Sequence, residues 1–142
     1  MSPEARRRTY VDAGVLIATI RGDAEAAQAA MQVLDDPERA LIVSDALWLE
    51  VLPKPIYEGR DQERQAHEAV FQGAHERVRW DVAVLRQAEH VASRYGLAAM
   101  DAIHVACAMA ANADEIVTTE KDIKPIFRVS EIRVISLREA QR

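Results

Sequence analysis

Residues 97–122 (LAAMDAIHVACAMAANADEIVTTEKD) constrain the fold more than any other stretch of this chain. The first half carries apolar residues at helical spacing. Residues 115–118 are short, apolar and β-branched, which is typical of a buried strand. A helix followed by a buried strand is the repeating unit of a parallel α/β sheet. We therefore expect this stretch to form one helix–strand unit of such a sheet.

Asp101 is an unusual residue within the predicted helix. Its neighbours three and four positions away, Leu97, Ala98, His104 and Val105, share its helix face and are mostly apolar. Burying an unpaired carboxylate is costly unless a cation or several hydrogen bonds hold it. The alternative is that Asp101 caps the helix, where its charge suits the helix dipole. The helix alone favours neither interpretation.

The strand that follows favours a site. It ends in Thr118, Thr119 and Glu120, and sites in open α/β sheets form where parallel strands release their C-terminal ends. A carboxylate just after such a strand is well placed to meet one presented by a helix. Further acids at equivalent places would therefore indicate a shared site.

Composition indicates an ordinary globular protein. With 142 residues, 49% hydrophobic and 29% charged, the chain is expected to form one domain. No apolar run approaches the ~18 residues that span a bilayer, and Asp12 interrupts the apolar region after the basic residues 6–8. The single Cys107 is expected in the core and excludes an internal disulfide. These features predict a cytoplasmic protein with no membrane association.

The rest of the chain alternates strands with helices. Strands are expected at residues 8–11, 41–44, 78–80, 115–118 and 132–135. Helices are expected from residue 12, at 23–35, at 45–52 with Pro53 as the stop, at 61–75 as an outer solvated helix, and at 82–95 with Gly96 as the stop. The apolar stripe of the predicted helix at residues 82–95, expected to be buried, comprises Val84, Leu85, Ala88, Val91 and Ala92. This order predicts an α/β fold with a mostly parallel sheet of about five strands, covered by helices on both faces.

Four acids fall at equivalent places in this alternation. Asp12 follows the first strand, Glu50 lies on the helix after the second, Asp101 lies on its helix, and Glu120 follows the fourth strand; Asp122 is a candidate fifth. Clustered carboxylates repel one another unless a cation is present. Oxygen ligands suit Mg²⁺ or Mn²⁺, and two such ions ~3.5–4 Å apart can promote phosphodiester cleavage.

Each acid also has an explanation without a metal. Asp12 would cap a helix, Glu50 would be a solvated helix residue, and Glu120 would lie in the first turn of a short helix. The net charge of −5 and the pI of about 5.4 argue against a protein that coats nucleic acid through charge alone. They do not exclude an enzyme whose acidic site is neutralised by metal.

Several motifs together resemble a known family. They are YVDAGVLI at residues 10–17, Ser44 with Glu50 six positions later, MDAIHVA at residues 100–106, and VTTEKDI at residues 117–123. In this order and spacing the chain resembles the PIN-domain family, close to the VapC-type toxins of bacterial toxin–antitoxin pairs. The resemblance extends over nearly the whole chain. It implies a single PIN-like domain, residues 1–142, with three layers.

The resemblance implies a Mg²⁺- or Mn²⁺-dependent endoribonuclease. Asp12, Glu50 and Asp101 correspond to the three core metal-binding acids and Glu120 to the fourth, whose role Asp122 would share. Ser44 and Thr118 correspond to the polar residues that orient the acids. The resemblance further implies an RNA substrate, a homodimer, and a small antitoxin protein that blocks the site.

Two departures from the family pattern motivate an alternative. Ala13 and Gly14 replace the usual Thr-Asn or Ser-Asn pair, and Glu120 stands where Asp is usual. Loss of a polar side chain that orients a ligand weakens metal affinity ~10–100-fold. The alternative is a catalytically degenerate PIN domain that binds RNA or a partner. A third interpretation is a metal-dependent phosphatase, although the second aspartate of the haloacid-dehalogenase phosphatases is replaced by Gly14.

The remaining candidates receive non-catalytic interpretations. His104 is expected to be a packed, hydrogen-bonded side chain outside the site. The pairs at residues 67–68 and 75–76 do not have the spacing of a zinc motif. The arginines at residues 6–8, 60, 64, 77 and 79 are interpreted as surface charge. Lys121 is the favoured contact to a scissile phosphate.

Overall fold

The structure is a computed structural model that describes residues 5–140. Five strands form one sheet in the order β3-β2-β1-β4-β5, and every neighbouring pair is parallel. The strands are β1 (Arg7–Val11), β2 (Arg39–Ser44), β3 (Glu76–Val78), β4 (Glu115–Thr118) and β5 (Arg133–Ser136). The predicted parallel sheet is therefore confirmed, and each predicted strand position is correct to within about two residues.

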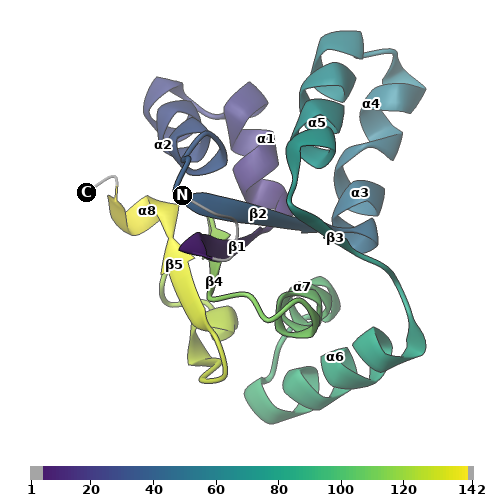
Figure 1. The fold of residues 1–142 in the computed structure, drawn as a ribbon, viewed down its shortest axis with the longest axis vertical. Coiled ribbons are helices and arrows are strands. Elements are labelled where there is room, and N and C mark those ends of the chain that lie inside the picture. The colour runs from purple at the N-terminus through teal and green to yellow at the C-terminus, as the bar shows by residue number, and fades with distance from the viewer. Residues whose placement is uncertain (1–4, 141–142) are drawn as a thin grey trace.

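Helices connect the strands and cover both faces of the sheet (Figure 1). They are α1 (Ala13–Arg21), α2 (Ala24–Leu34), α3 (Asp45–Val51), α4 (Pro53–Glu58), α5 (Asp61–Gly73), α6 (Val82–Tyr95), α7 (Ala99–Ala110) and α8 (Leu137–Ala140), with a short 3₁₀ helix η2 (Pro125–Arg128). Helices α1 and α2 lie on one side of the sheet, and α6 and α7 lie on the other. The three-layer α/β architecture is confirmed. Within the described residues, no helix is long and apolar enough to cross a membrane.

The core is divided in two by the sheet because successive strand residues point to opposite faces. Tyr10 packs with Ile116 and the apolar faces of α6 and α7. Its neighbour Val11 packs with Val117 and the apolar faces of α1 and α3. All four side chains are fully buried. The small aromatic content is sufficient because aliphatic side chains fill both layers.

One sequence-based expectation for the helices was wrong, and two features were not anticipated. Helix α3 ends at Val51, before Pro53, as expected, but Pro53 also starts α4, because the first position of a helix needs no backbone N–H donor. Leu85 faces solvent with 51% of its surface exposed, so it is not part of the stripe of α6. Helix α5 is largely exposed as expected, yet it buries Glu63 and His67. Arg21 and Arg60 contact Glu63 at 3.0 and 2.9 Å, which makes that burial tolerable.

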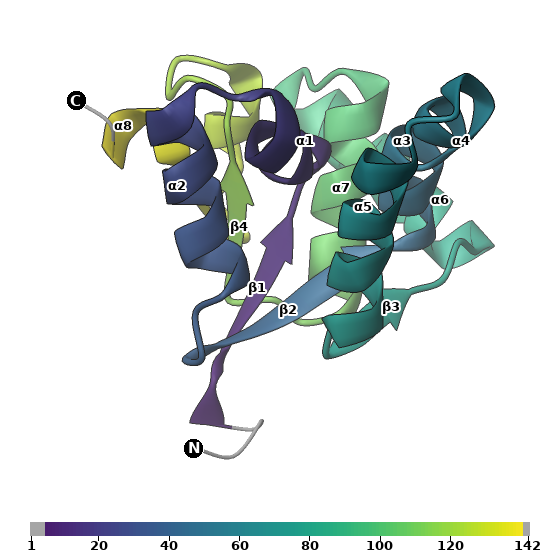
Figure 2. The same cartoon turned by 90° about the horizontal axis from the view of Figure 1, so that it is seen from above.

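The strand order places a crevice at the C-terminal ends of the central strands. The chain leaves β1 toward β2 on one side and returns to pair β4 on the other, so the order reverses between β1 and β4. In Figure 2 the arrowheads of β1 and β4 point the same way, and both end near α1. Ligand sites in open parallel sheets form at such a reversal.

Candidate functional site

Asp12 occupies the reversal point and has two structural tasks. It is the N-cap of α1, where Oδ1 accepts a hydrogen bond from the backbone N–H of Val15 at 3.4 Å. Its other oxygen, Oδ2, accepts from the hydroxyl of Thr118 at 2.5 Å. The capping interpretation of Asp12 is confirmed, and only 9% of the residue remains exposed. The carboxylate is thus held in a fixed orientation at the end of β1.

Burial raises the pKa of Asp12 from 3.8 to about 6. The hydrogen bond from Thr118 lowers the pKa, and positive charge on the His104 ring would lower it as well, whereas the nearby charge of Glu120 raises it. Desolvation is the largest cause, because a buried carboxylate loses its hydration. The protein alone therefore does not compensate fully for the free-energy cost of burying the charged Asp12 carboxylate.

Asp101 does not cap its helix. Ala98 is the N-cap of α7, without any side-chain cap, and Asp101 lies in the first turn. Burial raises the pKa of Asp101, and the charges of Glu120 and Glu50 raise it further. The capping interpretation is wrong, and Asp101 is a partly buried acid surrounded by other acids.

These electrostatic effects show which acids the fold brings together. Glu120 acts on both Asp12 and Asp101, and Glu50 acts on Asp101. Within residues 5–138, no three His, Cys, Asp or Glu side chains stand close enough to form a ready-made metal site.

Glu120 is placed by a turn after β4. Its backbone N–H donates to Thr118 Oγ1 at 3.0 Å, and its carbonyl oxygen accepts from the Ser136 hydroxyl at 2.6 Å. Thr118 therefore holds this turn while donating to Asp12. The pairing of β4 with β5 brings Ser136 into reach.

The expectation that His104 is a packed, hydrogen-bonded side chain is confirmed, but sequence reasoning did not identify its partners. Its Nε2 lies 2.5 Å from Glu50 Oε1, and its Nδ1 lies 2.6 Å from the Tyr10 hydroxyl. Tyr10 in turn lies 2.7 Å from Ser44 Oγ, which is the N-cap of α3. The available signal was the three-residue spacing from Asp101 to His104, which places both on one face of α7. His104 was expected outside the site, but it contacts one of the candidate acids.

The departure at Gly14 has a structural counterpart. A Cβ added to Gly14 would lie 2.0 Å from Thr119 Oγ1 and 3.3 Å from Asp12 Oδ1. No side chain fits there while Thr119 keeps its position. Gly14 therefore leaves space for Thr119, a side chain from the turn after β4.

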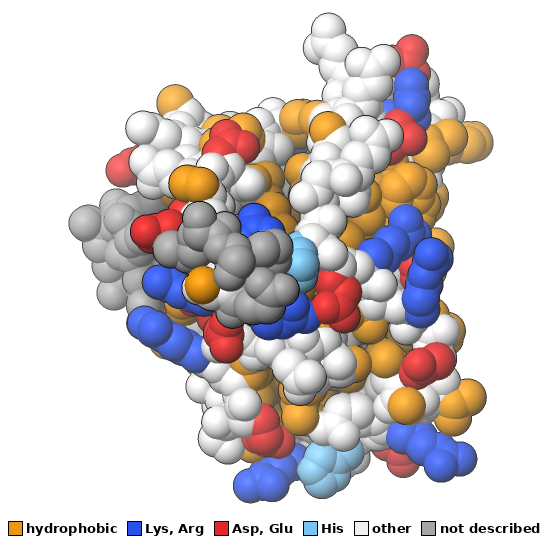
Figure 3. Space-filling model, in the orientation of Figure 1, with side chains coloured by type: hydrophobic (Ala, Val, Ile, Leu, Met, Phe, Trp, Pro, Cys, Tyr) orange, Lys and Arg blue, Asp and Glu red, His pale blue; other side chains and the backbone are white. Residues whose placement is uncertain are grey.

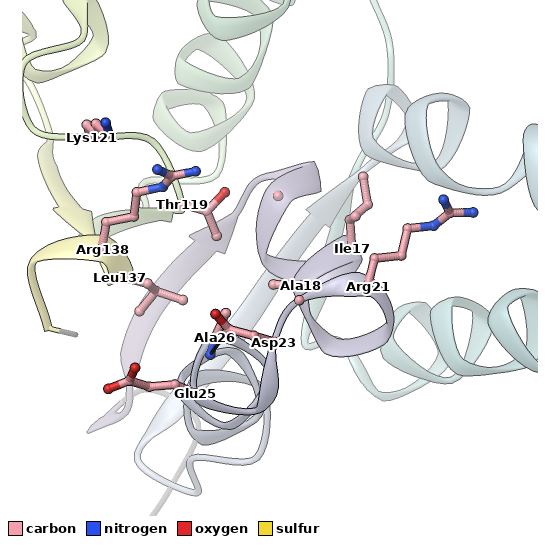
Figure 4. A pocket seen from close by; sticks show the side chains of 12 residues that line it. Ile17, Ala18, Arg21, Asp23, Glu25, Ala26, Thr119, Lys121, Leu137 and Arg138 are labelled. Carbon is pink, nitrogen blue, oxygen red and sulfur yellow. Dashed lines mark hydrogen bonds between the residues drawn. The ribbon is translucent and has the colours of Figure 1, made fainter.

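A groove of about 800 Å³ opens beside this turn. One wall comes from Thr119, Lys121 and Arg138, and the other comes from α1 and α2 (Figure 4). Lys121 and Arg138 are both exposed. Three cationic side chains, Arg21, Lys121 and Arg138, and two acidic ones, Asp23 and Glu25, thus line a groove that adjoins the turn after β4.

A second groove, of about 490 Å³, is mostly apolar and adjoins Glu50. Trp48, Trp80, Met100 and Ile103 line it. Figure 3 shows hydrophobic side chains gathered over the nearby helices α3 and α4.

Most of the remaining candidate arginines form ion pairs with nearby acids. Arg8 binds Glu76, Arg64 binds Glu68, and Arg77 lies 2.7 Å from Asp45. These contacts agree with the interpretation of the arginines as structural or surface charge. Cys107 is buried, as expected.

Comparison with known proteins gives one family and several structural likenesses. A family model described as the PIN domain matches residues 9–128. The structure of VapBC2 from Rickettsia felis bound to a promoter DNA fragment aligns with a TM-score of 0.69 at 12% identity, covering 91% of this chain and 98% of that chain. A toxin–antitoxin complex from Klebsiella pneumoniae aligns with a TM-score of 0.67 at 19% identity, covering 91% and 97%. DNA-bound VapBC from Salmonella typhimurium aligns with a TM-score of 0.63 at 14% identity, covering 92% and 98%. At these identities the likeness shows the fold, and no curated protein matches the chain.

Proposed function

This chain belongs to the PIN-domain family, and from that premise we propose that it is a metal-dependent endoribonuclease, the VapC-like toxin of a toxin–antitoxin pair. One observation carries the proposal. Asp12 and Asp101, from opposite halves of the chain, both have raised pKa values and both experience the charge of Glu120. Such mutual repulsion is relieved by a divalent cation.

The donor set fits a hard cation. The candidate ligands Asp12, Glu50, Asp101 and Glu120 offer only carboxylate oxygens, which suit Mg²⁺ or Mn²⁺. Cys107 is buried in the core cluster on the α6–α7 face of the sheet, and both ring nitrogens of His104 are engaged by protein groups. Because no compact ligand set is ready-made within the described residues, the longer side chains of Glu50 and Glu120 would complete the site, with Asp122 as an additional ligand.

The remaining residues orient the acids and the substrate. Thr118 fixes the Asp12 carboxylate, and Ser44 caps the helix that carries Glu50. A bound divalent ion supplies Lewis acidity, which activates water and stabilises charge on the phosphate. Lys121 and Arg138 would bind phosphates of an RNA strand in the adjoining groove. This arrangement suits hydrolysis of an RNA phosphodiester.

Partners are proposed from the structural likenesses. The similar structures are toxin–antitoxin complexes, so we propose a small antitoxin that covers the acids. The homodimer is proposed from the family resemblance alone. The protein is proposed to act in the cytoplasm.

Replacing Asp101 with Asn tests the proposal. Asp101→Asn removes a ligand charge while keeping the side-chain shape, so it should abolish Mn²⁺-dependent cleavage of RNA and leave the thermal unfolding midpoint near or above that of the unchanged protein. The matched control is Asp35→Asn, at an exposed position at the end of α2, which should cleave normally. Equal cleavage by Asp101→Asn would refute the nuclease assignment.

A degenerate domain remains the second candidate, favoured by the space at Gly14 and by the absence, within the described residues, of a ready-made ligand cluster. Its function would be binding RNA or a partner without cutting. Calorimetric titration with Mn²⁺ separates the candidates: no measurable binding favours the degenerate domain, and micromolar binding favours the nuclease. Turnover of small phosphomonoesters would instead support a phosphatase.

A further inference from the structure

Glu50 is held by a chain of hydrogen bonds that starts at the beginning of its own helix. The backbone N–H of Leu47 donates to Ser44 Oγ at 3.0 Å. Ser44 Oγ lies 2.7 Å from the Tyr10 hydroxyl, which lies 2.6 Å from His104 Nδ1. The chain closes on α3, where His104 Nε2 meets Glu50 Oε1 at 2.5 Å. It joins α3, β1 and α7.

The middle members of this hydrogen-bond chain are shielded from water. Ser44 and Tyr10 are fully buried, and His104 is 3% exposed. Glu50 is the exception, since about a third of its side chain is exposed. Buried polar groups need partners of the correct donor or acceptor type, because an unmatched one costs roughly 1–3 kcal/mol. The direction of each hydrogen bond is therefore constrained.

One direction satisfies every group in the chain. The backbone N–H of Leu47 is a donor, so Ser44 Oγ accepts there and its own proton is available for Tyr10. Tyr10 then donates to Nδ1 of His104, which must be unprotonated. The ring proton of His104 consequently lies on Nε2 and is donated to the Glu50 carboxylate.

The opposite direction is less favourable. If Nδ1 of His104 donated to Tyr10 and Tyr10 donated to Ser44, the Ser44 proton would have to turn to the Cys107 thiol, which lies against both hydroxyls and accepts weakly. In a neutral ring, Nε2 would then present a lone pair to a carboxylate at 2.5 Å.

We propose that His104 is a positioning residue, whose Nε2–H, with the ring oriented at Nδ1 by Tyr10 and Ser44, fixes the Glu50 carboxylate beside Asp101. This inference rests on the proposed metal site, because Glu50 is one of its ligands. His104 acts through Glu50 and does not touch the metal. The chain couples the N-terminus of α3 to the carboxylate one and a half turns further along the same helix.

The protonation of the ring is measured without metal. Long-range ¹H–¹⁵N correlation spectra of ¹⁵N-histidine-labelled protein at pH 7.5 separate protonated from unprotonated ring nitrogens. The chain has four histidines, and His104→Gln identifies the signals of this one by their loss. The proposal expects a proton on Nε2, the nitrogen that faces Glu50. A ring whose Nε2 carries no proton overturns it.

Substitutions test the positioning role through metal affinity. Tyr10→Phe keeps the buried ring and removes only the hydroxyl that orients His104 at Nδ1. It should weaken Mn²⁺ binding by about 10-fold, at the lower end of the usual effect of such supporting contacts. The matched control is Tyr95→Phe, because the Tyr95 hydroxyl bonds Ser130 and Glu131 at an exposed site. Unchanged affinity in Tyr10→Phe overturns the proposal.

Substitution of His104 itself separates hydrogen bonding from packing. In His104→Gln the side-chain amide N–H can take the place of Nε2–H, so Mn²⁺ affinity should stay within about 3-fold, whereas His104→Asn is too short and should lose about 10–100-fold. Equal affinities in the two variants contradict a positioning role. If only the His104 inference fails, the protein without substitutions still binds Mn²⁺ and cleaves RNA. If the proposed function fails, the protein without substitutions neither binds Mn²⁺ nor cleaves RNA, and both the function and the inference are overturned.

Discussion

At the scale of single residues, Asp12 shows how a site residue can work against stability. It caps α1 and is bonded by Thr118, yet burial still raises its pKa to about 6. The hydrogen bonds therefore do not compensate fully for lost hydration and for the charge of Glu120. A fold that retains this residue carries an electrostatic cost that a bound cation would remove.

Asp12→Asn should stabilise the metal-free protein at pH 7.5. The pKa of the folded state lies above the ordinary value of 3.8, so the folded protein binds more protons and its stability falls as pH rises from about 4 to about 6. The difference between the folded and ordinary pKa values corresponds to about 3 kcal/mol as an upper figure. Asn keeps the cap and removes the charge. Urea unfolding at pH 7.5 and pH 4 measures the difference in free energy of unfolding between Asp12→Asn and the unchanged protein. This difference should vanish at the lower pH. A variant less stable than the unchanged protein at pH 7.5 would contradict this explanation.

At the scale of elements, the start of α1 and the turn after β4 fit together as a pair. Gly14 lies in the first turn of α1, and Thr119 fills the space a side chain there would need. Gly14 does not have the positive φ that demands glycine. Its requirement is a contact between two elements more than 100 residues apart in sequence.

Gly14→Ala should destabilise the protein by about 1–3 kcal/mol, because the new Cβ would lie 2.0 Å from Thr119 Oγ1 and the turn must shift. Gly14→Ala combined with Thr119→Ala should recover most of that loss, since the overlapping hydroxyl is gone. A double-mutant cycle by urea unfolding measures the coupling. Gly73→Ala is the matched control, because nothing lies within 4 Å of its added Cβ. Additive effects at positions 14 and 119 would show that the contact is not the cause.

At the scale of the whole molecule, the proposed function requires an acidic protein to bind a polyanion. The net charge is −5, so RNA binding requires a local cationic surface. The groove beside the acids provides one through Lys121 and Arg138. Its position next to the turn that carries Glu120 would lead a strand toward the acids.

Lys121→Gln and Arg138→Gln should each weaken RNA binding to a similar degree for different sequences, and should each reduce the slope of log affinity against log salt by about 1. Fluorescence anisotropy with labelled RNA, in an Asp101→Asn background that does not cleave, measures both quantities. Arg86→Gln, at an exposed position on α6, should change neither. If Lys121→Gln and Arg138→Gln leave the slope unchanged, RNA does not occupy this groove.

The sequence predicts the sheet and most helices because their signals are local. Short β-branched runs and the Gly96 stop are read directly, and the structure has β4 and α6 at the predicted positions. The expected stop before Pro53 is confirmed, but α4 was not predicted, because a proline that ends one helix and a proline that begins the next look alike without the geometry of the chain. Likewise, the burial of Glu63 depends on Arg21, which lies 42 residues away.

The candidate site was predictable only in part, for the same physical reason. Acids at strand ends can be found because parallel strands end together. The partners of His104 cannot be found in this way, since Tyr10 lies 94 residues before it and Glu50 lies 54 residues before it. Similarly, no local pattern indicates that Gly14 makes room for Thr119. Contacts between side chains of distant elements become visible only in three dimensions.

The proposed function depends on acids from distant parts of the chain forming one pocket whose repulsion a divalent cation relieves. Isothermal titration of Mn²⁺ into the unchanged protein at pH 6, repeated in buffers of different ionisation enthalpy, tests this dependence. We expect micromolar binding with release of about half a proton, because Asp12 is about half protonated at its pKa and must lose that proton to bind metal. Absence of measurable Mn²⁺ binding would contradict a shared metal pocket.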